Sequence, residues 1–115
     1  MSELDSPLPA ENTMYVLDPD GKPVRPKTLR EWGEFMESGK RKVARDKISD
    51  DVEVSTVFLG MDHSFGSGPP VLWETMVFGG PLDQEEERYT CRRAAELGHA
   101  EMVARCKKAL EEQKP

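Results

Sequence analysis

This sequence contains little cysteine and no apolar run long enough to cross a bilayer. Only two of its 115 residues are cysteines, Cys91 and Cys106. If both lie on one helix they are more than about 20 Å apart, so they cannot form a disulfide with each other. Two unpaired thiols are typical of a reducing cytosol. The longest apolar runs hold about four residues, against the roughly 20 of a spanning helix. No basic segment followed by an apolar one marks a signal peptide.

Basic residues are also missing from a long stretch of the chain. Residues 48–87 carry nine acids and neither Lys nor Arg, whereas residues 21–47 carry nine bases against four acids. The net charge is −6, and the basic segment 40–47 has no interleaved aromatics, so we expect no nucleic-acid ligand. The segregated charges predict two faces of opposite sign. These faces complement each other within the fold or lie in solvent; the alternative is an electrostatic docking surface.

What remains is a polar but foldable composition. The hydrophobic fraction is 37%, and the chain has the length of one ordinary domain. Eight aromatics support a real core. We expect a soluble protein with a mobile N-terminal tail at residues 1–12, a single α+β domain at 13–112 and a short C-terminal tail at 113–115.

The periodicity of apolar residues predicts two helices and several strands. A capping box at Thr28–Glu31 begins the first helix, and Gly39 ends it. The last helix is expected from about Cys91 to Glu111, after an N-cap at Thr90, with His99 in its apolar stripe. Strands are expected at 14–17, 42–48, 52–59 and 71–78, with a short edge strand at 87–89. The order β-α-β-β-β-(β)-α predicts an α+β fold: an antiparallel sheet of three to five strands with two helices packed on one face.

The loop 60–70 (GMDHSFGSGPP) is the best candidate for a functional site, because loops carry sites more often than packed strands do. We expect no assembled catalytic set. The residues that we predict to bind a ligand or partner lie in this loop, with two more outside it: Asp62, His63, Phe65, Gly66, Gly68, Glu74 and His99.

Metal binding is one alternative for this region. Asp62 and His63, with Glu74 or His99, would supply oxygen and nitrogen ligands. Zinc and iron sites need three or four ligands, usually with close spacing such as His-x-x-x-His, and no such pair is present. We therefore expect neither a metal nor a cofactor.

Hydrolytic catalysis is a second alternative. His63 would act as base, Asp62 or Glu74 would orient it, and Ser64 or Ser67 would attack. Adjacent Asp and His residues rarely point at each other, and the Gly-x-Ser-x-Gly pattern is absent.

Anion binding by the amides of residues 66–68 is a third alternative. No Lys follows these glycines, and Pro69 and Pro70 remove two amide donors where a helix would begin. A purely structural connection between two long strands explains the same Gly/Pro-rich composition.

The roles of two further polar residues depend on which face of the sheet is open to solvent. Glu74 shares a strand face with Leu72, Met76 and Phe78, and is an ordinary residue if that face meets solvent. His99 is either a hydrogen-bonded histidine at a helix–sheet contact or a ligand or proton switch.

The central block of the chain resembles a family of small uncharacterised proteins of tailed bacteriophages and prophages. The resemblance is carried by residues 55–66 (STVFLGMDHSFG) and 68–80 (GPPVLWETMVFGG), and extends to Trp32 and to Gly98-His99. The family's last helix opens with an acidic or Trp-containing turn, whereas this one opens Cys91-Arg92-Arg93, so a surface contact made there would differ.

The resemblance implies a phage-encoded accessory protein that works in the cytoplasm of an infected bacterium. Such a protein would bind a host or phage macromolecule without chemistry of its own. The alternative is a small enzyme, or a nucleotide- or metal-binding protein, that uses the 60–70 loop.

Overall fold

The computed structural model describes residues 2–114. Two helices and six strands follow a short 3₁₀ turn, η1 (Glu3–Asp5). The elements, in chain order, are β1 (Val16–Leu17), β2 (Pro23–Val24), α1 (Leu29–Glu37), β3 (Lys42–Ser49), β4 (Val52–Phe58), β5 (Trp73–Phe78), β6 (Glu86–Tyr89) and α2 (Arg92–Glu112). The predicted α+β class with an antiparallel sheet is confirmed.

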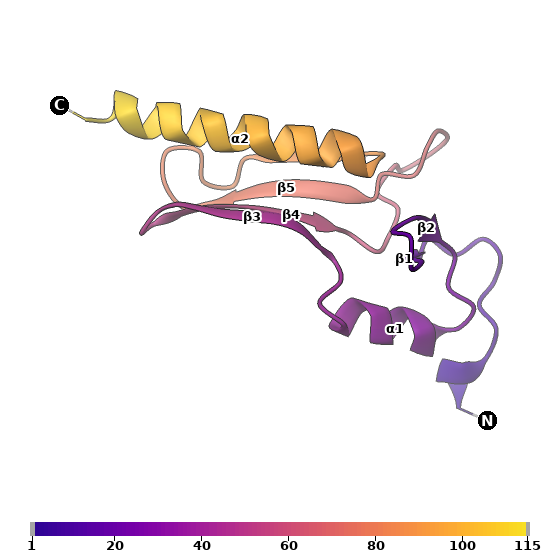
Figure 1. Cartoon of the computed structure of the whole chain (residues 1–115). Coiled ribbons are helices and arrows are strands. Elements are labelled where there is room, and N and C mark those ends of the chain that lie inside the picture. Colours follow the sequence, from indigo (N-terminus) through magenta and orange to yellow (C-terminus); the bar gives the residue numbers. More distant parts are fainter. Residues whose placement is uncertain (1, 115) are drawn as a thin grey trace.

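The main sheet has the order β3-β4-β5-β6, with every neighbour antiparallel, and α2 lies along one of its faces (Figure 1). Strict alternation along β4 produces this arrangement, because side chains at every second position point to the same face. Val54 pairs with Val77, and Thr56 pairs with Thr75, so the inward positions of both central strands line up under α2. The opposite face is not covered by a helix within residues 2–114.

The core between the sheet and α2 is built from two adjoining clusters. One contains Val54, Val77, Met102 and Cys106, towards the C-terminal end of α2. The other contains Phe58, Leu72, Trp73 and Ala95, towards its start. Burial raises the pKa of the Cys106 thiol, so this cysteine behaves as a core residue rather than as a nucleophile.

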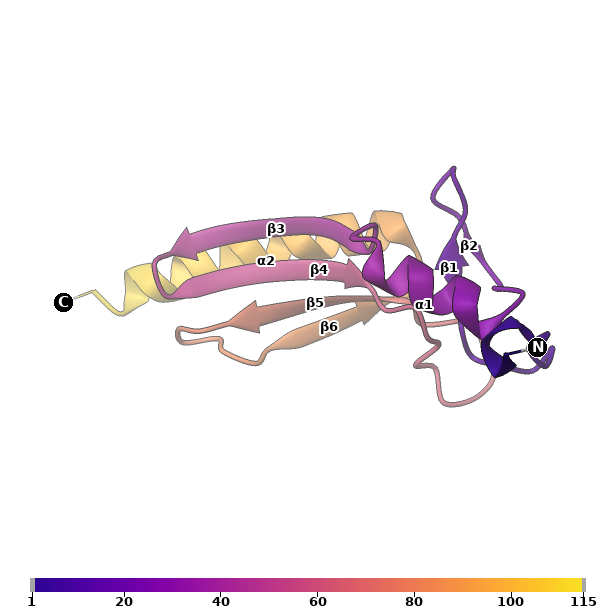
Figure 2. The same ribbon diagram turned by 90° about the horizontal axis from the view of Figure 1, so that it is seen from below.

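The placement of α1 corrects one part of the sequence-based prediction. Both helices were expected on one sheet face, but α1 packs on η1 and β1 at the end of the sheet (Figures 1 and 2). The reason is local: the α1 stripe meets Gly60, where β4 ends, and the ring of Phe35 packs edge-on to Phe58 at 5.8 Å between centroids. Phe58, the last residue of β4, is the residue on which Phe35 of α1 packs.

The start of α2 also differs from the expectation. Cys91 rather than Thr90 is the N-cap, and its Sγ accepts a hydrogen bond from the Ala94 amide at 3.4 Å. Further along, the exposed Arg92 and Glu96 form an i,i+4 ion pair. A thiol that caps a helix is a structural use of this cysteine.

The N-terminal residues that we predicted as a mobile tail are described from Ser2 onward. Asp5 forms an ion pair with Arg30 of α1, and the Leu8 amide donates to the Lys27 carbonyl. Met1 and Pro115, the ends of the two predicted tails, lie outside the described residues. No helix between residues 2 and 114 has the length and apolar character that crossing a bilayer requires.

Candidate functional site

The 60–70 loop is anchored where it leaves the sheet. The Gly60 carbonyl accepts hydrogen bonds from Trp32 Nε1 and from the Tyr15 amide, both at 2.9 Å. Gly60 has a φ of +79°, and a Cβ there would lie 2.5 Å from the Met36 sulfur. A left-handed φ favours glycine, and the two hydrogen bonds to its carbonyl let Trp32 of α1 and Tyr15, just before β1, hold the first residue of the loop in place.

Asp62 organises the interior of the loop. Its Oδ1 accepts hydrogen bonds from the amides of Ser64 at 2.8 Å and Val71 at 2.9 Å, and its Oδ2 accepts from the Ser64 hydroxyl at 3.0 Å. Partial burial raises the pKa of Asp62, but these donors outweigh it and bring the pKa below its ordinary value. One carboxylate thus links the two ends of the loop.

We expect acid to loosen this loop. Because the pKa of Asp62 is lowered in the folded chain, its stabilising contribution is present above the unfolded value of about 3.9 and is lost as the pH falls below it. Amide hydrogen exchange at Val71 measures this loss. Asp62→Ala should raise the exchange rate by about tenfold at neutral pH, and the protection of this amide relative to an unfolded peptide should no longer fall with acid. Unchanged exchange in the variant would show that the carboxylate does not hold the loop.

Phe65 lies at the tip of the loop and is turned into solvent. Its exposed fraction is 93%, against 58% for Leu97, the next most exposed large apolar residue among residues 2–114. Its φ is +55°, a left-handed conformation that is uncommon for a residue with a side chain. Gly66 and Gly68 follow it, both exposed, and Gly68 has a φ of +116°. The turn therefore presents an aromatic ring instead of tucking it onto the core.

His63 does not pair with the neighbouring carboxylate. Its Nδ1 donates to the Met61 carbonyl at 2.9 Å, and its backbone amide donates to Val71. The oxygens of Asp62 are directed to Ser64 and Val71 instead. The Asp-His dyad that hydrolysis would need is therefore not formed by the described hydrogen bonds.

Glu74 and His99 lie on opposite faces of the sheet. Glu74 is on the open face, where its carboxylate accepts from Arg88 Nε at 2.9 Å. His99 is 6% exposed under the other face. The two residues cannot join the loop in one ligand set. Among residues 2–114, no group of three or more His, Cys, Asp or Glu side chains is placed to hold a metal ion.

A buried chain of polar side chains crosses the contact between α2 and the sheet. Asp46 Oδ1 lies 2.7 Å from His99 Nε2, and His99 Nδ1 lies 2.7 Å from Thr56 Oγ1. Thr56 Oγ1 lies 2.6 Å from Thr75 Oγ1, which accepts from the Tyr89 hydroxyl at 3.1 Å. Both threonines are fully buried. We call these five residues the polar chain.

The polar chain has one consistent direction for a neutral imidazole. A carboxylate only accepts, so His99 Nε2 carries the proton that is donated to Asp46. His99 Nδ1 then accepts from Thr56, Thr56 accepts from Thr75, and Thr75 accepts from Tyr89. Each threonine hydroxyl donates once and accepts once, and the Tyr89 hydroxyl donates, so no member is left unpaired. Burial raises the pKa of Tyr89, which keeps the phenol in its donating form.

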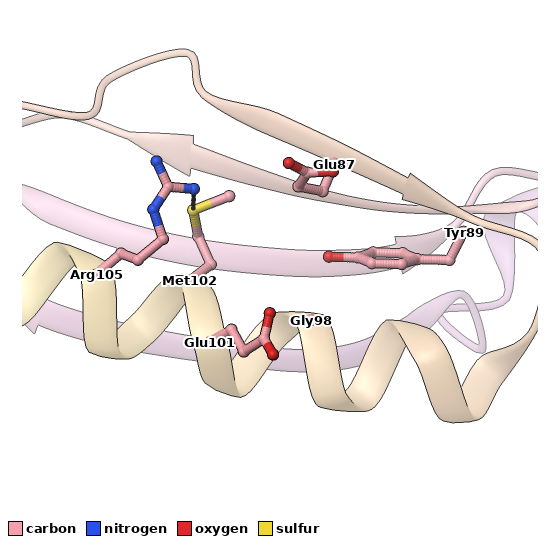
Figure 3. Close-up of a pocket in the computed structure, with 6 residues that line it drawn as sticks. All are labelled: Glu87, Tyr89, Gly98, Glu101, Met102 and Arg105. Atoms are coloured by element: carbon pink, nitrogen blue, oxygen red, sulfur yellow. Dashed lines mark hydrogen bonds between the residues drawn. The ribbon is translucent and has the colours of Figure 1, made fainter.

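The polar chain ends at a shallow groove of about 200 Å³ beside α2. Figure 3 shows the Tyr89 ring reaching over Gly98, with Glu87 and Glu101 on the two sides of the groove. A Cβ at Gly98 would lie 2.1 Å from the Tyr89 hydroxyl oxygen, so this glycine permits the close helix–sheet approach. The exposed Arg105 at the end of the groove is paired with Glu85. The groove is thus mainly acidic.

Sequence reasoning placed His99 correctly in the stripe of α2 but missed the rest of the polar chain. Thr56 and Thr75 resemble ordinary strand formers, and Asp46 resembles a solvated charge in a basic segment. One signal was available: both threonines occupy inward positions of strands whose other inward residues are Val, Phe and Trp. A hydroxyl at such a position needs a partner.

Comparison with known protein families, with curated proteins and with solved structures finds no match to this chain. The resemblance to phage proteins is therefore not tested by them and stays a prediction.

Proposed function

We propose that this chain is a binding protein of an infected bacterial cell, which captures a host or phage protein through the 60–70 loop with Phe65 as its anchor. The observation that carries this proposal is the Phe65 ring, 93% exposed on a left-handed residue. Holding an aromatic side chain in such a conformation costs about 1 kcal/mol or more, and strain of this kind is found where it serves a function.

The fixed base of the loop supports the proposal. Gly60 is tied to Trp32 of α1 and to Tyr15, and Asp62 ties the loop to Val71, just before β5. A preordered loop loses less entropy on binding, so more of the contact energy appears as affinity. An apolar pocket on the partner, wide enough for one phenyl ring, is the chemistry that this tip fits.

The runner-up is a small enzyme, or a nucleotide- or metal-binding protein, that uses Asp62, His63 and Glu74. Each of these side chains already has a partner within the chain. Asp62 accepts hydrogen bonds from Ser64 and Val71. His63 donates to the Met61 carbonyl, and Glu74 pairs with Arg88. A thermal-shift screen with divalent metals and nucleotides tests this alternative. A shift of several degrees that is lost in His63→Ala would favour it over the binding protein.

Removing the ring should weaken capture strongly without unfolding the chain. We expect Phe65→Gly to weaken partner binding by about 30-fold, as for an interface hot spot, while stability is unchanged or slightly higher, because glycine accepts a positive φ. The first measurement is affinity capture from bacterial lysate, followed by titration of the purified partner.

Leu97→Ala is the matched control, because it removes an exposed apolar side chain from the outer surface of α2. A partner that is captured equally by wild type, by this control and by Phe65→Gly would rule out the ring as the anchor. Capture by wild type and Leu97→Ala alone supports the proposal.

A further inference from the structure

The polar chain crosses the whole width of the main sheet. It takes one side chain from each strand and one from α2: Asp46 of β3, Thr56 of β4, Thr75 of β5, Tyr89 of β6 and His99. Its two ends differ in their surroundings. The side chain of Asp46 is half exposed at one edge of the sheet, whereas Tyr89 lies beside the groove at the other edge. A buried row of hydrogen bonds thus connects the two edges.

The inner members of the polar chain cannot change their hydrogen bonds independently. Thr56 and Thr75 are fully buried, and neither hydroxyl has another hydrogen-bond partner among residues 2–114. A hydroxyl carries a single hydrogen, so each threonine donates in one direction only. A change of donor at one end of the row therefore turns every hydroxyl in it.

A proton on His99 is such a change. While the ring is neutral, Nδ1 accepts from Thr56, and all donors in the row point from Tyr89 towards Asp46. The protonated ring has an N–H group on both nitrogens, so Nδ1 donates to Thr56 instead. Thr56 then donates to Thr75, and Thr75 donates to Tyr89, across the same separations of 2.6 and 3.1 Å. Only hydroxyl hydrogens turn, and no heavy atom has to move.

Tyr89 is the member of the row that has an outlet. Once its oxygen accepts from Thr75, its own hydrogen points away from the row and into the groove, which Glu87 and Glu101 border (Figure 3). Burial is the main reason that the pKa of Tyr89 is raised, and the charges of both glutamates raise it as well. Carboxylates are acceptors, so the groove stabilises a phenol hydrogen that points towards it.

We propose that the polar chain is a pH-sensitive switch, in which uptake of a proton by His99 reverses the row and changes what Tyr89 presents to the groove from an acceptor oxygen to a donor hydroxyl. Histidine is the side chain that ordinarily gains and loses a proton near neutral pH. The switch does not involve the 60–70 loop and does not rest on the function proposed for it.

The charges around His99 favour its protonated form. β4 and β5 present only apolar residues and threonines at their inward positions. The ionisable groups that face the ring come from β3, from β6 and from α2 itself: Asp46, Glu87, Tyr89, Glu96, Glu101 and Arg105. Glu96 is paired with Arg92, and Arg105 with Glu85. The acids that remain lie at the two ends of the row, where each stabilises the donors that a positive ring creates.

NMR titration of both histidines tests the switch. His63, the only other histidine, lies outside the polar chain and is the internal reference. As the pH falls, the nitrogen shifts of His99 should change from a ring protonated at Nε2 alone to one protonated at both nitrogens. The Raman doublet of a tyrosine ring reports whether its hydroxyl donates or accepts. In Tyr15→Phe, which removes the only other tyrosine, the doublet of Tyr89 should change with the same midpoint as His99.

Interrupting the row should make the proton harder to bind. In Tyr89→Phe the reversed Thr75 hydroxyl has no acceptor, whereas the neutral arrangement loses only a donor. We expect the titration midpoint of His99 to fall by about one pH unit, with that of His63 unchanged. Thr75→Val should have the same effect, and the matched control Thr75→Ser, which keeps the hydroxyl, should titrate like wild type.

Circular dichroism establishes that each variant is folded. A His99 ring that stays neutral until wild type unfolds overturns the proposal. So does a doublet of Tyr89 that does not follow His99, or a His99 midpoint that is unchanged in a folded Tyr89→Phe or Thr75→Val variant. An equal fall of the His63 midpoint would also overturn it, because the effect would then not pass through the row.

Discussion

Phe58→Ala is expected to lower the free energy of unfolding by about 3–5 kcal/mol, the range for a fully buried phenylalanine. Phe58 has no exposed surface, and its ring packs edge-on against both Phe35 of α1 and Trp73 of β5. Its backbone also exchanges two hydrogen bonds with Arg41, from amide to carbonyl at 2.8 Å and from Arg41 Nε at 3.0 Å. It joins α1 to the sheet.

Urea unfolding measures this effect, because the midpoint falls while an unchanged slope shows that the unfolded surface is the same. We also expect hydrogen exchange in α1 to rise more than in α2, since the Phe58 ring packs directly on Phe35 of α1. Phe65→Ala is the matched control: the same atoms are removed from a side chain that is 93% exposed. A loss below about 1 kcal/mol in Phe58→Ala would contradict this account of the core.

His99→Ala is the second large effect that we expect, with a loss of about 2–4 kcal/mol. It removes a buried ring and two hydrogen bonds of 2.7 Å, and it leaves the Thr56 hydroxyl, which is fully buried, without its acceptor. Asp46 has a side chain that is 54% exposed and can turn to water. Asp46→Ala should therefore cost much less, about 1 kcal/mol.

A double-mutant cycle separates the polar chain from packing. Thr56→Val keeps the shape of the side chain and removes the hydroxyl, so it leaves both His99 Nδ1 and Thr75 with an unpaired group. The losses in Thr56→Val and His99→Ala should then be less than additive by about 1 kcal/mol or more. Additive losses would show that the two residues contribute by packing alone.

The strands and the last helix were predictable because their signals are local. Alternation in β4 and the three- to four-residue stripe of α2 follow from backbone geometry, and both elements end within two residues of their predicted bounds. The capping box was equally local: the Glu31 amide donates to Thr28 Oγ1 at 3.1 Å. β2 was not among the predicted strands, because Pro23 has no backbone amide to donate to a strand ladder.

The loop was found from its composition, since a Gly/Pro-rich segment between two strong strands stands out without a structure. Its internal contacts did not follow from composition. Asp62 and His63 are adjacent, yet they bond to different partners, because neighbouring side chains in an extended segment point to opposite sides. The exposure of Phe65 depends on a left-handed backbone that no residue type at this position predicts.

By itself the sequence determined the α+β class, the order of the elements and the position of the loop, because propensity, periodicity and turn chemistry act over a few neighbouring residues. Only the tertiary structure decided that α1 lies at the end of the sheet, that Glu74 is on the open face and that Asp46, His99 and Tyr89 join one polar chain. Those outcomes depend on contacts between residues up to 53 positions apart, which local patterns do not record.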